Sequence, residues 1–250
     1  MKRILKYFFS HLVILSWVVT AHAQKGTVAP SAVRIGTDLG FLGVSLFDPD
    51  RRMYEFNADI DFYKMFITAD FGLSGWEFTQ EGFAYDNSGS YFKVGIDYNL
   101  IARDTDLNVI YFGVKYANAS FEEKFSYSIT DPFFSDYSEE IFKPGMSAHW
   151  YEANFGMKIR VWKELFLGWA GRIKFAKKSK GEPSSFNTFY IPGYGKAEYD
   201  SRWGFNFNVY YRIPFREKPP YKPKKVKKEV ERDPEDERQP SNNQQMNIGF

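Results

Sequence analysis

The sequence predicts an all-β fold: an eight-stranded, antiparallel, up-and-down β-barrel that spans a membrane, followed by a disordered tail. Three observations predict it. Apolar and polar residues alternate in eight separate segments, and the connections between these segments alternate between short and long. The chain is also 20% aromatic, although its mean hydropathy is only −0.45. Many aromatic residues without long apolar runs are typical of strands that are apolar on one face.

Residues 1–23 have the layout of a secretory signal peptide, with a basic start, an apolar stretch and small residues before the cleavage point. The basic start holds Lys2, Arg3 and Lys6. A membrane anchor is the alternative, but the apolar stretch is short and interrupted, whereas a spanning helix needs about 20 apolar residues. We expect cleavage after Ala23 and a short periplasmic segment at 24–32. No cysteine follows, which excludes lipoprotein acylation.

Loss of the signal peptide takes three positive charges with it, so the formal charge changes from +2 to −1. This balance argues against a nucleic-acid partner, which would demand a strong basic excess. The chain has no cysteine, and His149 is the only histidine after residue 23. Disulfides, thiolate sites and histidine clusters are therefore excluded, and we expect neither a metal nor a cofactor.

The eight predicted strands follow in order along residues 33–215. They cover 33–46, 53–62, 66–78, 91–100, 107–121, 148–161, 165–175 and 201–215. Alternation is clearest in 91–100, where Phe92, Val94, Ile96, Tyr98 and Leu100 share one face and Tyr91, Lys93, Gly95, Asp97 and Asn99 the other. The first and fifth segments alternate less regularly, which is consistent with a bulge.

The predicted connections differ in length from one end of the barrel to the other. Those after strands two, four and six are short, at 63–65, 101–106 and 162–164. Those after strands three, five and seven are long, at 79–90, 122–147 and 176–200, and the short first hairpin at 48–51 belongs to the same side. Short periplasmic turns and longer extracellular loops are typical of outer-membrane barrels. An even strand number places both termini in the periplasm.

Alternation does not say which face points outward, so a soluble barrel is an alternative. An eight-stranded barrel has room inside only for packed side chains, and the apolar face supplies too many large residues for it. The other face carries Gly36, Gly72, Gly95, Gly113, Gly156, Gly168 and Gly204. It also carries Arg34, Asp38, Glu55, Asp59, Asp61, Asp70, Lys93, Asp97, Lys115, Glu152, Lys158, Arg160, Arg172, Lys174, Arg202 and Arg212. Small residues and balanced charges suit a narrow lumen, so we expect the apolar face to contact outer-membrane lipids.

This layout resembles the small outer-membrane barrel superfamily of the OmpA and OmpX type, over about residues 31–215. The last strand is similar to the aromatic-ended signal that the barrel-assembly machinery reads, which would consist of Phe207, Val209, Tyr211, Ile213 and Phe215. Pro214 departs from that pattern, because proline donates no ladder hydrogen bond, but a strand end tolerates it. The aromatic-rich style and charged tail look most like uncharacterised barrel families of Bacteroidota.

Residues 216–250 change composition abruptly. A basic, proline-containing block precedes an acidic block and a polar end, which predicts a disordered periplasmic tail. It is either a solvated extension or a docking segment that binds a protein partner at the periplasmic face. The docking residues would be Lys222, Lys224, Lys225, Lys227, Lys228, Met246, Ile248 and Phe250. Such a segment would place charges and apolar side chains on the partner.

The search for catalytic or ligand-binding residues finds weak candidates only. His149, with Ser147 and Glu152 nearby, is the single possible base of a lipid-modifying enzyme, and its parity places it on the apolar face. Acidic oxygens of Asp131, Asp136, Glu139 and Glu140 suggest calcium, but their spacing matches no known calcium loop. The last long loop carries Phe186, Phe189, Tyr190, Ile191, Pro192, Gly193, Tyr194 and Gly195. These aromatics either recognise a sugar or partner, or pack on one another above the barrel.

The sequence therefore favours a non-enzymatic outer-membrane barrel with a structural or scaffold role. It would act as an accessory subunit of an envelope complex, such as outer-membrane protein assembly or secretion machinery, and dock through its tail. A lipid-modifying enzyme and a small pore are the alternatives.

Overall fold

The computed structural model describes residues 29–130, 133, 135–180 and 187–216. The predicted signal peptide, most of the segment at 24–32 and all eight docking residues of the tail lie outside these ranges. Among the residues that are described, no helix is both long enough and apolar enough to cross a membrane.

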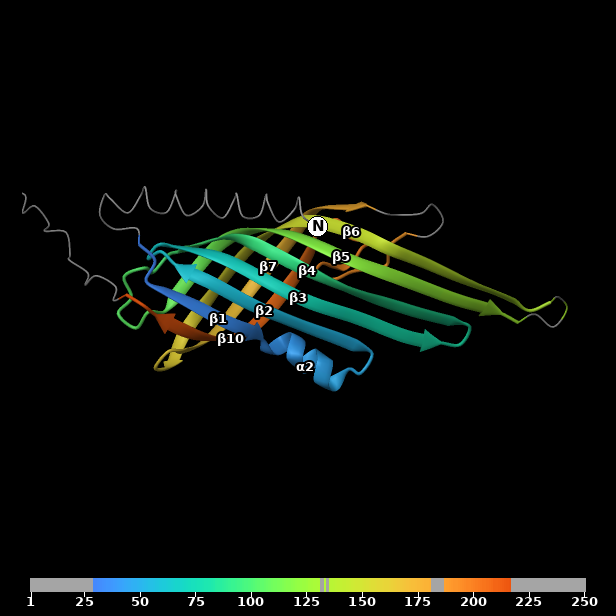
Figure 1. Cartoon of the computed structure of the whole chain (residues 1–250), viewed down its shortest axis with the longest axis horizontal. Helices are drawn as coiled ribbons and strands as arrows, with labels where there is room; N and C mark the ends of the chain where they lie inside the picture. The colour runs from blue at the N-terminus through green and yellow to red at the C-terminus, as the bar shows by residue number, and fades with distance from the viewer. Residues whose placement is uncertain (1–28, 131–132, 134, 181–186, 217–250) are drawn as a thin grey trace, which may run out of the picture. The chain divides into compact units, whose positions relative to one another are not determined.

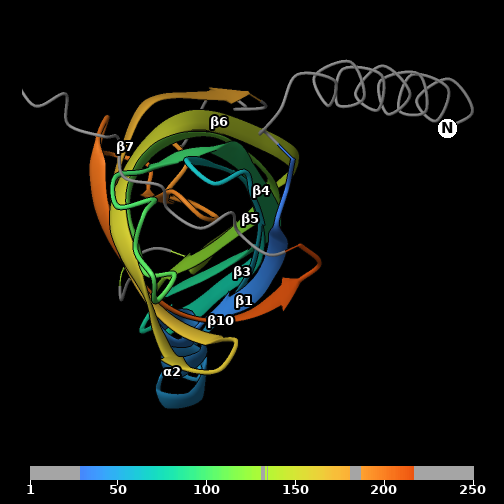
Figure 2. The same cartoon turned by 90° about the vertical axis from the view of Figure 1, so that its left-hand side faces the viewer.

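Eight antiparallel strands close into one barrel, which confirms the predicted fold (Figures 1 and 2). The strands are β1 (Ala32–Asp38), β2 (Arg51–Asp61), β3 (Met65–Gln80), β4 (Phe83–Asn99), β5 (Val109–Ile129), β6 (Tyr137–Trp162), β7 (Leu165–Lys180) and β10 (Arg202–Pro214). They are neighbours in chain order, and β1 pairs with β10 to close the ring. A small hairpin of β8 (Tyr190–Ile191) and β9 (Gly195–Lys196) lies between β7 and β10 in the sequence.

The strands are tilted, and the register measures the stagger. One row of paired residues starts at Tyr211 on β10 and passes through β1 to β6 until it reaches Phe175 on β7. Tyr211 also pairs directly with Leu165 on β7. The row thus returns to the same strand ten residues away, since 175 − 165 = 10. Such a stagger is what closing a tilted sheet requires.

Three strands are much longer than predicted at one end of the barrel. Residues 83–90, 122–129 and 137–147 were expected in loops but belong to β4, β5 and β6 (Figure 1). The alternation continues there with its polarity reversed, because Tyr85 and Phe125 point inward and Asp86 points outward. The bulge considered for the fifth segment is found between Phe121 and Glu123.

The predicted first strand, 33–46, is wrong in its second half. β1 ends at Asp38, and Leu39–Phe47 forms the helix α2, which lies outside the barrel ring (Figure 2). The Asp38 carboxylate caps this helix, because it accepts hydrogen bonds from the backbone N–H of Gly40 at 2.7 Å and of Phe41 at 3.1 Å. The irregular alternation of this segment therefore marked a change from strand to helix.

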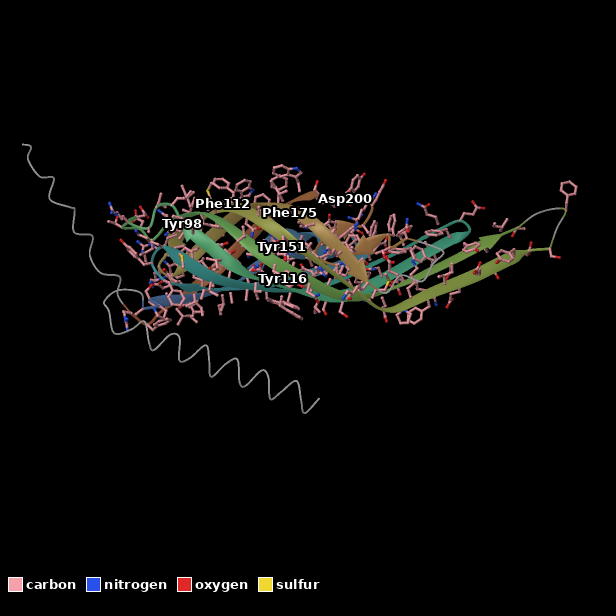
Figure 3. All side chains as sticks on the ribbon, turned by 90° about the horizontal axis from the view of Figure 1, so that it is seen from above. Tyr98, Phe112, Tyr116, Tyr151, Phe175 and Asp200 are labelled. Carbon is pink, nitrogen blue, oxygen red and sulfur yellow. The ribbon has the colours of Figure 1, made fainter. Side chains whose placement is uncertain are left out.

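The outward face carries a belt of apolar residues. On β3 it runs from Met65 to Leu73, and the next polar outward residue along this strand is Glu77. Aromatic residues are frequent at both edges of the belt: Tyr98 pairs with Phe112 near the short-turn end, and Tyr116, Tyr151 and Phe175 form a row farther along (Figure 3). Beyond this row the outward positions of the long strands are mostly polar, so the apolar belt has a defined height.

Candidate functional site

The inward face is filled with charged side chains of both signs. Among the described residues, the buried acids are Asp38, Glu55, Asp59, Asp61, Asp70, Asp97, Glu123 and Glu152. The buried bases are Arg34, Lys93, Lys143, Lys158, Arg172, Lys174 and Arg212, and Lys115 is nearly buried. With Lys115 the two sets are equal, as the sequence predicted for the lumen. Arg160 and Arg202, also predicted there, are only half-buried.

Glu55 of β2 is the centre of the largest cluster. Its carboxylate accepts hydrogen bonds from the Arg172 guanidinium at 2.5 Å and the Tyr91 hydroxyl at 2.8 Å, and it lies 3.2 Å from the Lys93 ammonium. The same two cations approach Glu152 at 3.3 and 3.6 Å. This cluster joins β2, β4, β6 and β7 across the lumen. Buried charges are tolerated when they are paired and hydrogen-bonded, and this pairing accounts for the burial of five polar side chains at the centre of the lumen.

Two smaller clusters fill the half of the lumen nearer the short turns. Asp59 of β2 binds Arg34 of β1 at 2.8 Å and Lys158 of β6 at 2.6 Å. Asp70 of β3 binds Lys115 of β5 at 2.6 Å. The Lys158–Asp59 pair crosses the ring from β6 to β2, the Asp70–Lys115 pair spans β4, and the Arg34–Asp59 pair joins the neighbouring strands β1 and β2, so together they link most of the barrel wall.

Glycines make room for the large side chains in this lumen. A Cβ on Gly72 would lie 2.1 Å from the Tyr91 ring, and one on Gly156 would lie 2.7 Å from the Tyr111 hydroxyl. A Cβ on Gly168 would lie 2.7 Å from the Tyr210 ring. Real Cβ atoms do not approach other atoms so closely, so these inward glycines are required by the tyrosines beside them.

The β8–β9 hairpin packs against inward side chains at the end of the barrel away from the short turns. The Lys174 ammonium donates to the carbonyl oxygens of Gly193 at 2.7 Å and Tyr194 at 3.1 Å. The Tyr194 ring packs against Trp150 with a centroid separation of 5.5 Å. Ile191 and Tyr194 belong to a buried apolar cluster with residues of β4, β5 and β6. We call residues 188–198 the plug.

Glu123 of β5 anchors the start of the plug. Its carboxylate accepts hydrogen bonds from the backbone N–H of Phe189 and Tyr190, both at 3.1 Å, and from the Tyr85 hydroxyl at 2.8 Å. Burial raises the pKa of Glu123 above its usual value, and the hydrogen bonds and the nearby Lys143 offset this only in part. The sequence did not identify Glu123 as an inward residue, because it lies within 122–147, which was assigned to a loop. Trp150 lies in the predicted strand 148–161 with the parity of Glu152, but its apolar side chain was not singled out.

The aromatics of the last long loop are not simply displayed outward. Tyr194 and Ile191 are buried, and Phe189, near the start of the plug, packs with Trp76, Phe78 and Tyr85. The structure thus supports the alternative in which they pack together at the barrel mouth. Gly193 and Gly195 have positive φ angles of 76° and 114°, as turn glycines do. Phe186 lies outside the described residues.

His149 lies on the outward face of β6, as predicted, and its ring centroid is 6.1 Å from that of Tyr116, with the rings tilted. Glu152 lies on the inward face and binds Lys93 and the Trp150 indole. The side chains of His149 and Glu152 are therefore on opposite sides of the barrel wall, and the sheet does not bring them together as an acid–base pair.

The acids of the third long connection are engaged with other side chains. Glu139 accepts hydrogen bonds from the hydroxyls of Tyr127 and Tyr137, which lower its pKa, and Glu140 lies 3.0 Å from Lys124. Asp131 lies outside the described residues. No group of three or more potential metal ligands is found within the part of the chain that the structure covers.

The proposed assembly-signal residues lie at the end of β10. Phe207, Tyr211, Ile213 and Phe215 are exposed on the outward face, with Val209 between them. Pro214 is the last residue of the strand, where its missing N–H is tolerated. Their reading by an assembly machinery stays a prediction.

Fold and lumen define a class: small eight-stranded barrels whose interior is filled by ion pairs and whose outer surface carries an apolar belt. The chain belongs to the family described as a domain of unknown function, DUF6048, whose model matches residues 4–218. No curated protein matches the sequence.

Three solved barrels are similar to the chain at a low level. The N-terminal β-barrel domain of OprF from Pseudomonas aeruginosa is 8% identical, with a TM-score of 0.33 over 74% of this chain and 100% of that chain. CarO and CarO2 from Acinetobacter baumannii are each 8% identical, with TM-scores of 0.37 and 0.38 over 76% and 75% of this chain and all of theirs. The eight-stranded fold rests on the chain's own strand register. The resemblance to Bacteroidota families stays a prediction.

Proposed function

We propose that the protein is a non-conducting outer-membrane barrel with a structural, scaffold role. The observation that carries this proposal is the lumen, in which three clusters of buried ion pairs and the plug follow one another. A transport protein needs an open passage through the barrel. A closed barrel without one can still act as a scaffold, because it anchors its loops and tail at the membrane.

The belt supports a membrane location. On β3 it spans nine residues, from Met65 to Leu73, and a transmembrane β-strand needs about 9–11 residues. Many outward residues are large, apolar and about half exposed, such as Phe71, Phe92 and Phe155, all at 47–49%. Soluble monomeric proteins rarely expose a continuous apolar surface of this size to water. Paired charges inside and apolar residues outside are the arrangement of a membrane barrel.

The lengths of the strands support an orientation. The short turns and the described chain ends share one end, which we assign to the periplasm, and the extended β4, β5 and β6 project from the other, which we assign to the cell exterior (Figure 1). The long strands would then present polar outward residues to water. Short periplasmic turns and larger extracellular parts are the common pattern in such barrels.

Conductance tests the closed lumen. The purified barrel in planar lipid bilayers is expected to give no steady single-channel steps. A variant in which a short Gly-Ser linker replaces the plug tests its contribution, and it should remain nearly silent because the Glu55–Arg172 pair still closes the lumen. Large, steady currents from the unmodified protein would contradict the proposal and favour the alternative of a small pore.

The accessory role rests on the tail. Its basic block, which includes Lys222, Lys224 and Lys225, would face the periplasm and suits an acidic surface on an envelope complex. Affinity purification from native membranes, with the full chain and with a chain ending at residue 216, tests this. The full chain should retain partners that the shortened chain loses. Identical partners for both would remove the docking claim but leave the closed barrel untouched.

The alternative of a lipid-modifying enzyme has little support in the geometry, because His149 and Glu152 face opposite sides of the sheet. A His149→Ala variant tests it directly. We expect the lipid A profile of cells that carry this variant to match that of the wild type, and an altered profile would revive the enzyme hypothesis.

A further inference from the structure

In one part of the barrel wall β1 is too short to lie between its two neighbours, β2 and β10. β1 pairs with β2 only up to Thr37 and with β10 only up to Asp38. Residues 51–55 of β2 and 202–207 of β10 therefore have no β1 residue between them. The helix α2 contacts both strands in this region and lies outside the ring (Figure 2). We call residues 51–55, 202–207 and α2 the seam.

On the β2 side of the seam, side chains and a turn replace the missing strand. The Ser45 hydroxyl donates to the Met53 carbonyl oxygen at 2.8 Å and accepts from the Met53 N–H at 2.7 Å. Thr37 donates to the Glu55 carbonyl oxygen at 3.0 Å, and the Arg51 N–H donates to the Asp48 carbonyl oxygen at 3.1 Å. The edge of β2 is thus satisfied, and α2 is held on it.

The β10 side differs. Residues 202–207 pair with β7 on one side, and alternate backbone groups of an antiparallel strand point to the other side. Across the described residues, no backbone hydrogen bond reaches this free edge. The Asn206 side-chain amide donates to the carboxylate of Asp38, the last residue of β1. An open sheet edge that meets hydrocarbon leaves polar groups unsatisfied, which membrane barrels avoid.

The helix that lies over this edge is apolar on every side. Its sequence is LGFLGVSLF, none of its residues is buried, and Leu46 and Phe47 are 80% and 89% exposed. Its single polar side chain, Ser45, is used by Met53. A helix that is hydrophobic all round needs an apolar surrounding. Although α2 contacts β2 and β10, Leu46 and Phe47 stay exposed.

The position of the seam indicates what surrounds the apolar side chains of α2. The outward residues of β10 beside α2 are Trp203, Phe205 and Phe207, which are 68%, 58% and 54% exposed and continue the apolar belt. The helix ends at Phe47, and the charged sequence Asp48-Pro49-Asp50-Arg51 follows it. The apolar helix therefore lies alongside the belt, and its charged end marks the level at which the belt stops.

We propose that the seam is a binding site for the acyl chains of lipids in the outer leaflet, which surround α2 and cover the free edge of β10. This inference rests on the proposed membrane location. Continuity with the belt favours lipid over other occupants. A partner strand would need its own apolar outward face, and a second copy would have to bring a surface that complements a protruding helix.

The test uses the absence of cysteine from the chain, so that a single introduced cysteine takes one environment-sensitive fluorophore. Leu46→Cys reports on α2. Ile96→Cys, outward in the belt on β4, is the control within lipid, and Asp86→Cys, outward on the same strand beyond the belt, is the control in water. Each labelled barrel is reconstituted at low protein density into phosphatidylcholine vesicles with or without brominated chains, which quench the fluorophore by contact.

The inference expects brominated chains to quench the label at Leu46 about as strongly as the label at Ile96, with little loss at Asp86. Quenching at Ile96 but not at Leu46 would overturn it and leave the membrane location intact. Quenching at Leu46 that disappears as protein density rises, with Ile96 unchanged, would mean that a second copy displaces lipid from α2, and this also overturns it. If Ile96 itself is not quenched, the membrane location and the inference fail together. Phe47→Cys repeats the measurement one residue farther along.

Discussion

At the scale of single residues, most buried charges at the centre of the lumen lie beside an opposite charge from a different strand. Glu55 has Arg172 and Lys93, and Asp59 has Arg34 and Lys158. Removal of one partner from a buried pair costs about 3–5 kcal/mol, because the other charge stays buried without compensation. The pairs therefore make the closed lumen specific, whatever their net contribution to the free energy of unfolding.

Glu123 offers a residue-scale prediction outside the belt. Glu123→Gln keeps an oxygen that accepts from the N–H groups of Phe189 and Tyr190, whereas Glu123→Ala leaves both without a partner. A buried group left without its hydrogen bond costs about 1–3 kcal/mol. Hydrogen exchange should therefore show strong loss of protection at these two amides in the alanine variant and little loss in the glutamine variant. Equal loss in both variants would contradict the anchoring role.

The same carboxyl group predicts a pH dependence. Burial raises the pKa of Glu123 above its usual 4.5, so the folded plug favours the neutral acid. The stabilising contribution is complete below pH 4.5 and is lost as the pH rises through the raised value. Protection factors at Phe189 and Tyr190 should thus be higher in acid than at neutral pH, and Glu123→Gln should remove the difference. Protection that falls on acidification would contradict this.

At the scale of elements, the sheet depends on inward glycines. Gly72→Ala would place a Cβ 2.1 Å from the Tyr91 ring, so that the tyrosine must move and lose its hydrogen bond to Glu55. Overpacking of this kind costs about 1–3 kcal/mol. Gly43→Ala in α2 is the control, since its Cβ meets nothing within 4 Å. There the gain of helix propensity is at most about 1 kcal/mol.

Urea unfolding of the reconstituted barrel measures both changes. The midpoint is expected to fall for Gly72→Ala and to stay or rise for Gly43→Ala. A fall of equal size in both variants would mean that alanine disturbs assembly in general, and that Gly72 has no special relation to Tyr91.

The elements also show what the sequence could predict. Strands such as β2 and β4 alternate strictly within the belt, so their faces and most lumen charges followed from periodicity. Outside the belt the outward face meets water and the inward face packs on aromatics, so the polarity reverses and 83–90 looked like a loop. The helix α2 depends on a cap from Asp38 and on Ser45 bonding to Met53, contacts that no local pattern reveals. The plug likewise depends on long-range contacts, such as those of Lys174 and Glu123.

At the scale of the whole molecule, the inner and outer faces of the barrel wall carry opposite kinds of residue. Charges and glycines lie inside, and an apolar belt, nine residues long on β3, lies outside, bordered by aromatics such as Tyr98 and Tyr151. This is the reverse of a soluble protein, in which the apolar face is buried. Apart from the seam, the closed ring that the described residues form has no unpaired strand edge, so the backbone groups of the wall are hydrogen-bonded and tolerate hydrocarbon.

The most direct test is whether the mature chain belongs to a bilayer. The refolded protein is mixed with phospholipid vesicles and centrifuged through a density gradient after an alkaline wash that removes surface-bound proteins. We predict that it floats with the vesicles and that, in the absence of lipid or detergent, it aggregates. A mature chain that remained a dissolved monomer without detergent and stayed at the bottom of the gradient would contradict the outward orientation of the apolar belt.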